Sequence, residues 1–161
     1  MNILYDHQIF VLQKYGGISR YFNELNANIN HIENCNSTIS LLNSDNECLP
    51  KNKTSSRGFW SSHKLRKNNL NNRIKLNIDY TNNLLRSNTY DIFHPTYYNP
   101  YFLDNINSPF VLTIHDMIHE LYPEFFITTD KSEIYKKVLA EKSSRIIAVS
   151  KNTKKEIIKL Y

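Results

Sequence analysis

Two adjacent glycines, in a chain that contains only three, are the first residues whose spacing suggests chemistry. Gly16 and Gly17 precede a segment with helical periodicity, and Arg20 lies one turn into it. A helix N-terminus offers unpaired N–H groups and a positive dipole end, and glycine lets a ligand approach the backbone. The pattern favours a phosphate or carboxylate site, with a simple turn as the alternative. It matches neither the dinucleotide-binding Gly-x-Gly-x-x-Gly motif nor a P-loop.

Polar residues also follow three consecutive apolar segments that read as strands. They are His94 and Tyr97 after the first, His115 and Asp116 after the second, and Ser150 after the third. The carboxyl ends of parallel strands share one edge of a sheet, and ligands of open α/β sheets bind beyond that edge. Two histidines there could bind sugar hydroxyls or act near a reacting centre. A histidine taken singly is more often structural.

Other chemistries fit these residues less well. His115 and His119 are four residues apart, as in a helical metal site, but His115 ends a strand and so leaves the helix face. Ser150 could complete a Ser–His–Asp triad, yet it lacks the flanking glycines of a nucleophile elbow. Asp116 is expected to orient either His115 or a backbone turn. We therefore expect no metal and no cofactor, and hydrolase chemistry is disfavoured.

Short apolar runs and helical periodicity alternate along the chain, and they define the elements that must position these residues. Strands are expected at 3–5, 37–42, 91–94, 110–114 and 145–149, and helices at 18–32, between 70 and 88, from about 130 to 142, and from 151 to 161. The segment after the first strand, through Lys14, is expected to be a loop, as is 43–62. The hydroxyl of Ser150 is placed to cap the last helix.

This order predicts the fold class. The strands are apolar runs without polar alternation, so both of their faces should be covered. We expect an α/β fold with a Rossmann-like, mostly parallel sheet and helices on both faces. The length of 161 residues fits one domain.

The composition excludes several classes of protein. A hydrophobic content of 40% argues against wholesale disorder. No apolar run is long enough to span a membrane, and the first residues do not resemble a signal peptide. Cys35 and Cys48 fit neither a zinc site nor a disulfide framework. A reduced, cytoplasmic protein is the expectation.

The net charge of +5 is unevenly distributed. No acidic residue lies between Glu47 and Asp79, whereas the segment from Lys51 to Lys75 is rich in lysine and arginine and includes Phe59 and Trp60. Such a stretch suits nucleic acid, an anionic bilayer surface or a phosphorylated substrate. A solvated loop is the alternative.

The combined motifs resemble the N-terminal domain of family 4 retaining glycosyltransferases of the GT-B fold. The residues that carry the resemblance are the N-terminal strand followed by Tyr15–Phe22 (YGGISRYF), then Tyr90–His94 (YDIFH), Thr113–Asp116 (TIHD) and Arg145–Ser150 (RIIAVS). The resemblance covers nearly the whole chain except about residues 43–88, where only the general alternation of helix and loop matches. It implies one half of a GT-B enzyme, with residues 1–161 as its N-terminal Rossmann-like domain.

The resemblance also implies roles for residues. Gly16, Gly17 and Arg20 would bind the donor diphosphate, and His115 with Asp116 would serve catalysis at the transferred sugar. His94, Tyr97 and Ser150 would bind the acceptor. The implied partners are a GDP- or UDP-sugar donor and a glycan or lipid-linked acceptor, as in polysaccharide biosynthesis. The implied location is the cytoplasm, with peripheral contact at the anionic inner membrane face and no nucleic acid.

One departure from the family is large. The C-terminal domain, which supplies the nucleotide pocket, a basic pair for the diphosphate and a Glu-x7-Glu motif, has no counterpart in these residues. A leaving diphosphate needs cations or helix dipoles to stabilise its charge, so the chain alone is expected to be inactive. Two alternatives remain open. One is a non-catalytic α/β module that binds a phosphorylated ligand or an acidic partner, and the other is a nucleic-acid-binding domain that uses the basic stretch.

Overall fold

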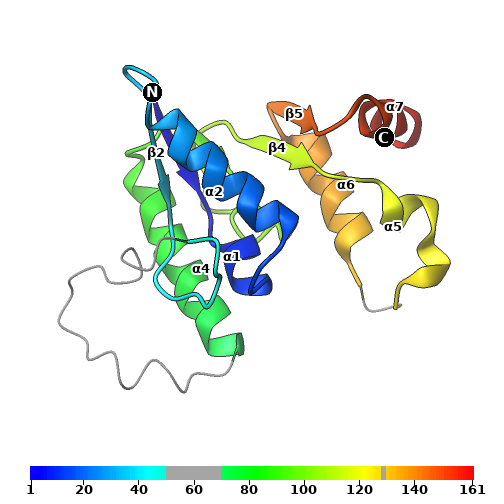
Figure 1. Ribbon diagram of the computed structural model, residues 1–161, viewed down its shortest axis with the longest axis horizontal. Coiled ribbons are helices and arrows are strands. Elements are labelled where there is room, and N and C mark those ends of the chain that lie inside the picture. Colours follow the sequence, from blue (N-terminus) through cyan, green and yellow to red (C-terminus); the bar gives the residue numbers. More distant parts are fainter. Residues whose placement is uncertain (50–69, 128–129) are drawn as a thin grey trace.

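The chain folds into a parallel α/β structure, seen in a computed structural model that describes residues 1–49, 70–127 and 130–161 (Figure 1). The strands are β1 (Asn2–Tyr5), β2 (Asn36–Ile39), β3 (Ile92–His94), β4 (Val111–Ile114) and β5 (Arg145–Ala148). β1 pairs in parallel with both β2 and β3, and β4 pairs in parallel with β5. A single parallel bridge between Phe93 and Phe110 links the two sheets, which gives the order β2-β1-β3-β4-β5. The predicted fold class is confirmed.

Helices connect these strands. They are α1 (Gln8–Leu12), α2 (Gly17–Ile29), α4 (Leu70–Ser87), α5 (Ile118–Leu121), the 3-10 turn η1 (Pro123–Phe125), α6 (Ser132–Lys142) and α7 (Lys151–Leu160). The four longer helices were predicted from their periodicity, and all four are confirmed. The short α1 was expected to be loop, so that prediction is wrong at residues 8–12. The short α5 and η1 were not predicted.

The side chains of β1 alternate between two hydrophobic clusters, as the pleat of a strand requires. Ile3 and Tyr5 pack with Phe22 of α2, whereas Leu4 packs with Leu85 of α4 and with Phe93. A helix therefore covers each face of the sheet at β1, with α2 and α4 on opposite sides (Figure 1). This arrangement explains why the first strand is apolar throughout.

The prediction that the strands are covered on both faces is wrong at β5. Ile146 is 38% exposed and Ile147 is 40% exposed. Because consecutive residues of a strand point to opposite faces, both faces of β5 are partly exposed. β5 is the edge strand of its pair with β4, and among its apolar residues only Ala148 packs against a hydrophobic cluster. Apolar patterning alone cannot distinguish a central strand from an edge strand, because both kinds of strand can consist of the same apolar residues.

Candidate functional site

The strand order creates a switch point at the carboxyl edge of β1. The chain passes from β1 to β2 on one side and returns to β3 on the other, so the connections that leave this edge diverge. In open α/β sheets, ligands bind in the crevice at such a point. In register, Tyr5 lies opposite His94, and the segments after β1, β3 and β4 all begin at this edge. The sequence predicted that the segments after β3, β4 and β5 share one edge, and the parallel pairing of β4 with β5 and the parallel bridge between Phe93 and Phe110 agree with this.

His94 lies inside the protein rather than on its surface. It is 4% exposed, its Nε2 lies 2.9 Å from the hydroxyl of Thr113, and its ring contacts Tyr5 and Phe22. Burial and, to a smaller extent, the neighbouring His115 together lower the pKa of His94 to about 4. His94 is therefore enclosed by its neighbours, and little of its side chain is open to a ligand.

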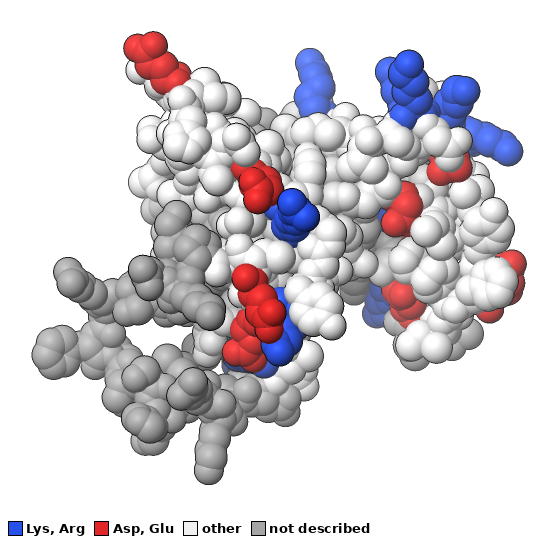
Figure 2. Space-filling model, viewed as in Figure 1, with Lys and Arg blue, Asp and Glu red and all other residues white. Residues whose placement is uncertain are grey.

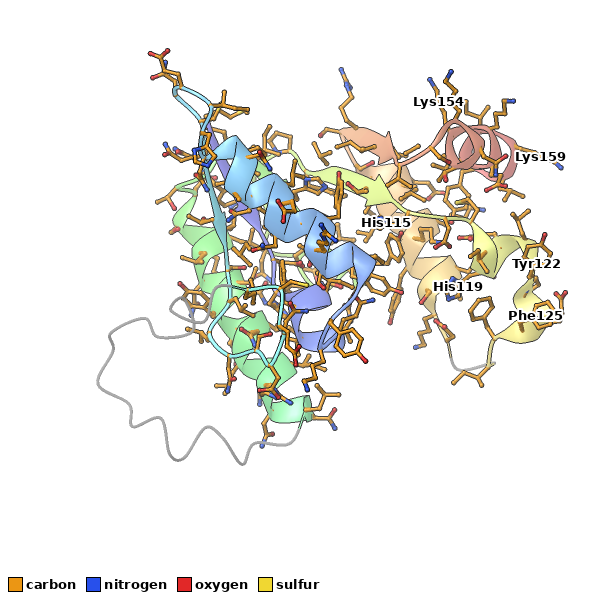
Figure 3. All side chains as sticks on the ribbon, viewed as in Figure 1. His115, His119, Tyr122, Phe125, Lys154 and Lys159 are labelled. Atoms are coloured by element: carbon orange, nitrogen blue, oxygen red, sulfur yellow. The ribbon has the colours of Figure 1, made fainter. Side chains whose placement is uncertain are left out.

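His115 occupies the end of β4 beside the first turns of α2 (Figure 3). Its ring packs edge-on against Tyr21, with centroids 5.5 Å apart, and against Phe22 at 6.1 Å. Its Nε2 is shielded from solvent and has no hydrogen-bond partner among the described residues. Burial lowers the pKa of His115, against the opposing effect of Asp116, so the imidazole is neutral near pH 7. A neutral ring with an unsatisfied nitrogen is suited to a hydroxyl partner.

Asp116 shapes the backbone after β4. Its Oδ1 accepts a hydrogen bond from the N–H of Ile118 at 3.1 Å, and its carbonyl oxygen accepts one from Lys136 Nζ at 3.0 Å. Of the two expected uses of this aspartate, the contacts support the turn. Lys136 is fully buried and also pairs with Glu120 Oε2 at 3.0 Å. Sequence reasoning missed this pair, because a lysine in a helix of mixed charge gives no sign of burial.

The two glycines lie where the sequence predicted. Gly16 is the N-cap residue of α2 and Gly17 is its first residue. A Cβ on Gly17 would have no atom from beyond its chain neighbours and its own helical turn within 4 Å, so there is open space beside the helix end. Arg20 is exposed and forms no ion pair with a carboxylate in the described ranges. Tyr21, one turn after Gly17, contacts His115, so the glycine turn and His115 are near neighbours.

A buried carboxylate follows β1, and sequence reasoning did not single it out. Asp6 accepts hydrogen bonds from the N–H and hydroxyl of Thr96, from the side-chain amide of Gln8 and from the hydroxyl of Tyr101. Gln8 in turn exchanges hydrogen bonds with the backbone of Asn99. These contacts tie the end of β1 to the loop after β3 and fix the shape of the carboxyl edge.

Tyr97 lines a cleft of about 290 Å³ at the same edge. The other lining residues come from the start of the chain after β1, from the loop after β3 and from the start of α6: Gln8, Leu12, Tyr98, Asn99, Asp130, Lys131, Ser132 and Tyr135. Burial raises the pKa of Tyr97, with Asp130 and Asp116 adding to the effect, so its phenol stays protonated at neutral pH. Hydroxyl, amide and aromatic groups of this kind suit a polar organic ligand. His115 does not line this cleft.

Ser150 caps α7, as predicted, because its hydroxyl accepts the N–H of Thr153 at 3.0 Å. It is therefore held by its own helix and is not among the residues that line the cleft. Most of the basic stretch from Lys51 to Lys75 lies outside the described residues. Of its described cations, Arg73 pairs with Asp45 and Lys75 is exposed on α4.

Within the described ranges, no group of three or more metal-binding side chains comes together. The helices in those ranges are also too short or too polar to cross a bilayer. Comparisons of the chain with protein-family models, with curated proteins and with solved structures found no match.

Proposed function

We propose that this chain is the acceptor-side half of a retaining glycosyltransferase. The enzyme would transfer a hexose from a GDP- or UDP-sugar to a glycan or lipid-linked acceptor. One observation carries the proposal: the N-terminus of α2, with its glycines, lies beside the unsatisfied ring of His115 at the carboxyl edge of the sheet. A donor bound there would have its diphosphate on the helix end and its sugar toward the histidine.

The donor side of this arrangement is an anion site. The first N–H groups of α2 lack helical partners, and the open space at Gly17 permits a phosphate to approach them. Arg20 adds a positive charge one turn further along. These groups would stabilise part of the charge that develops on the leaving diphosphate. The rest of that charge needs groups from outside these residues, which is why the chain alone is expected to be inactive.

His115 would act as a hydrogen-bonding group and not as an acid. Its pKa is lowered by burial, so it holds no extra proton to give at neutral pH. A neutral imidazole would orient the transferred sugar through one hydroxyl, and Asp116 would hold the turn that fixes the ring. Retaining transfer of this kind would depend on positioning and on diphosphate stabilisation. No metal or cofactor enters the proposal.

The acceptor would lie in the cleft that Tyr97 lines. Tyr97, Gln8 and Ser132 are suited to the hydroxyl groups of a glycan, since each offers a polar group beside apolar surface. Lys131 at the rim would favour an acceptor that carries a phosphate. His94 would contribute indirectly, through its packing against Phe22 beneath His115.

The test is binding of UDP-hexose and GDP-hexose to the purified chain, measured by NMR titration. We expect weak binding that Gly17→Val abolishes, because the added side chain would stand in the phosphate approach, where there is open space around a Cβ at this position. Ala27→Val, an exposed β-branched substitution in the same helix, is the matched control and should bind normally. Unchanged binding by Gly17→Val would refute the anion site, and sugar transfer by the chain alone at a normal rate would refute the half-enzyme proposal.

A non-catalytic module that binds a phosphorylated ligand is the second candidate. Arg20, which is exposed beside the helix end and pairs with no carboxylate among the described residues, favours it. Comparing the affinity for UDP with the affinity for UDP-hexose distinguishes the two functions. If UDP binds as well as UDP-hexose, and His115→Gln changes neither affinity, the binding module is supported. If His115→Gln weakens only the sugar-bearing ligand, the transferase half is supported.

A further inference from the structure

Besides the stretch from Lys51 to Lys75, positive charge gathers at α7 and its flanks. Residues 142–161 contain six basic side chains and one carboxylate, Glu156, a net charge of +5. The basic residues are Lys142, Arg145, Lys151, Lys154, Lys155 and Lys159. In Figure 2, blue side chains gather where Figure 1 places α7. This region is separate from the glycine turn and from the cleft beside Tyr97.

The lysines of α7 are unpaired and directed outward. All four are exposed, and none lies within ion-pair distance of a carboxylate in the part of the chain that the structure describes. Figure 3 shows Lys154 and Lys159 projecting from the helix away from the body of the protein. Glu156 accepts a hydrogen bond from Asn152 at 2.6 Å and forms no ion pair with these lysines in the described ranges. Four lysines and one carboxylate leave α7 with a net charge of +3 that a partner can meet.

An aliphatic side chain lies among these lysines. Ile158 is 72% exposed, and its spacing from Lys151 and Lys155 places all three on one side of α7. The opposite side carries Thr153 and Ile157, which are buried against the body of the protein. The outer side of α7 is thus cationic with an apolar centre.

We propose that this outer side of α7, made of Lys151, Lys154, Lys155, Ile158 and Lys159, binds the surface of an anionic lipid bilayer. The lysines would contact headgroup phosphates and Ile158 would enter the boundary of the acyl chains. This partner accounts for both the charge and the exposed isoleucine, whereas a nucleic acid backbone would use only the charge. Lysine is also a compact point charge that suits mobile headgroups, and the helix carries no arginine for bidentate recognition of a phosphate. The inference does not depend on the proposed sugar transfer.

Co-sedimentation with vesicles tests the proposal in the full chain. Vesicles of phosphatidylcholine alone and vesicles with about one third phosphatidylglycerol would be compared at low and high salt, because surface attraction is screened by ions. Each lysine is worth roughly a five-fold change in partitioning. The triple variant Lys154→Gln, Lys155→Gln, Lys159→Gln should therefore lose binding to anionic vesicles by about two orders of magnitude. All three residues are exposed, so the fold should be retained, and a circular dichroism spectrum checks this.

The matched control removes the same charge elsewhere. Lys14→Gln, Lys75→Gln, Lys137→Gln takes three exposed lysines from other elements and should change binding much less. Equal losses in both triple variants would show a general charge effect and overturn the proposal. Ile158→Ser should weaken vesicle binding several-fold without altering binding to duplex DNA. If Ile158→Ser has no effect, or if DNA binds more tightly than vesicles at equal phosphate concentration, a bilayer is the wrong partner.

Discussion

The buried ion pair between Lys136 and Glu120 gives the sharpest prediction about how the turn at His115 is held. Lys136 is fully buried in α6, and its Nζ donates both to Glu120 and to the carbonyl oxygen of Asp116. The ammonium also lies 5.2 Å from the centre of the Tyr98 ring. Replacing Lys136 with methionine keeps much of the volume but leaves the Glu120 carboxylate without its cation.

Removal of one partner from a buried ion pair costs about 3–5 kcal/mol, because the remaining charge stays desolvated. Each kcal/mol lowers the melting temperature of a protein of this size by about 2–4 °C, so Lys136→Met should lower Tm by roughly 6–20 °C. The double variant Lys136→Met, Glu120→Gln should recover part of this loss. It removes the unpaired charge, and the new amide oxygen can still accept the hydroxyl of Tyr161, which now donates to Glu120 at 2.6 Å.

Thermal unfolding followed by circular dichroism measures these effects, with Lys137→Met as the control at an exposed neighbour in the same helix. The control should stay within about 0.5 kcal/mol of the wild type. A second readout is the pKa of His115 by NMR titration. The charge of Lys136 helps to lower that pKa, so Lys136→Met should raise it. A Tm for Lys136→Met that equals the control, or a double variant that loses as much as the two single variants together, would refute the reasoning.

Three further predictions follow from single side chains. Burial holds the pKa of His94 at about 4 in the folded protein, whereas an unfolded histidine titrates near 6.5. As the pH falls from 6.5 to 4, the unfolded chain therefore binds a proton that the folded protein does not, and about 3 kcal/mol of stability should be lost. Urea unfolding against pH measures this loss, and His94→Gln should lack that part of the slope. Ser150→Ala should cost about 1 kcal/mol through loss of the α7 cap, and Ser144→Ala, whose hydroxyl has no hydrogen bond in the described structure, should cost less in the same melting assay. Tyr101→Phe should cost about 1–2 kcal/mol in urea unfolding because it removes one donor from the buried Asp6 carboxylate, and an unchanged midpoint would argue against that contact.

The elements that sequence reasoning identified are those with a strong local signal. Apolar runs at β1 and β4 and the helical periodicity of α2 gave the α/β order and the position of Gly16 and Gly17 at a helix start. The cap at Ser150 was equally local, since it depends on one hydroxyl and the next turn. The rule that parallel strands share a carboxyl edge placed His94 and His115 at one edge, whereas the contact of His115 with Tyr21 of α2 was found only in the structure.

The features that were missed depend on contacts between distant parts of the chain. The helix α1 is five residues long, too short to be stable alone, and tertiary contacts such as the hydrogen bond from the N–H of Ile9 to Thr96 hold it. Asp6 is buried only because Thr96 and Tyr101 bring donors to it from about ninety residues away. The exposure of β5 likewise follows from its place at the edge of the sheet, which no local pattern records.

The two halves of the candidate site belong to different hydrophobic clusters. The glycine turn leads into α2, whose Phe22 packs with Ile3 and Tyr5, whereas His115 ends β4, whose Ile114 packs with the other cluster. Aromatic rings connect the two halves. Phe22 contacts the rings of both His94 and His115, and His94 is hydrogen-bonded to Thr113 of β4. The distance between the helix end and His115 is therefore set by the packing of Tyr21 and Phe22 against that ring, and not by a direct bond between the two functional groups. The buried His94 therefore belongs to the site, because its packing helps to fix the positions of His115 and of the first turns of α2.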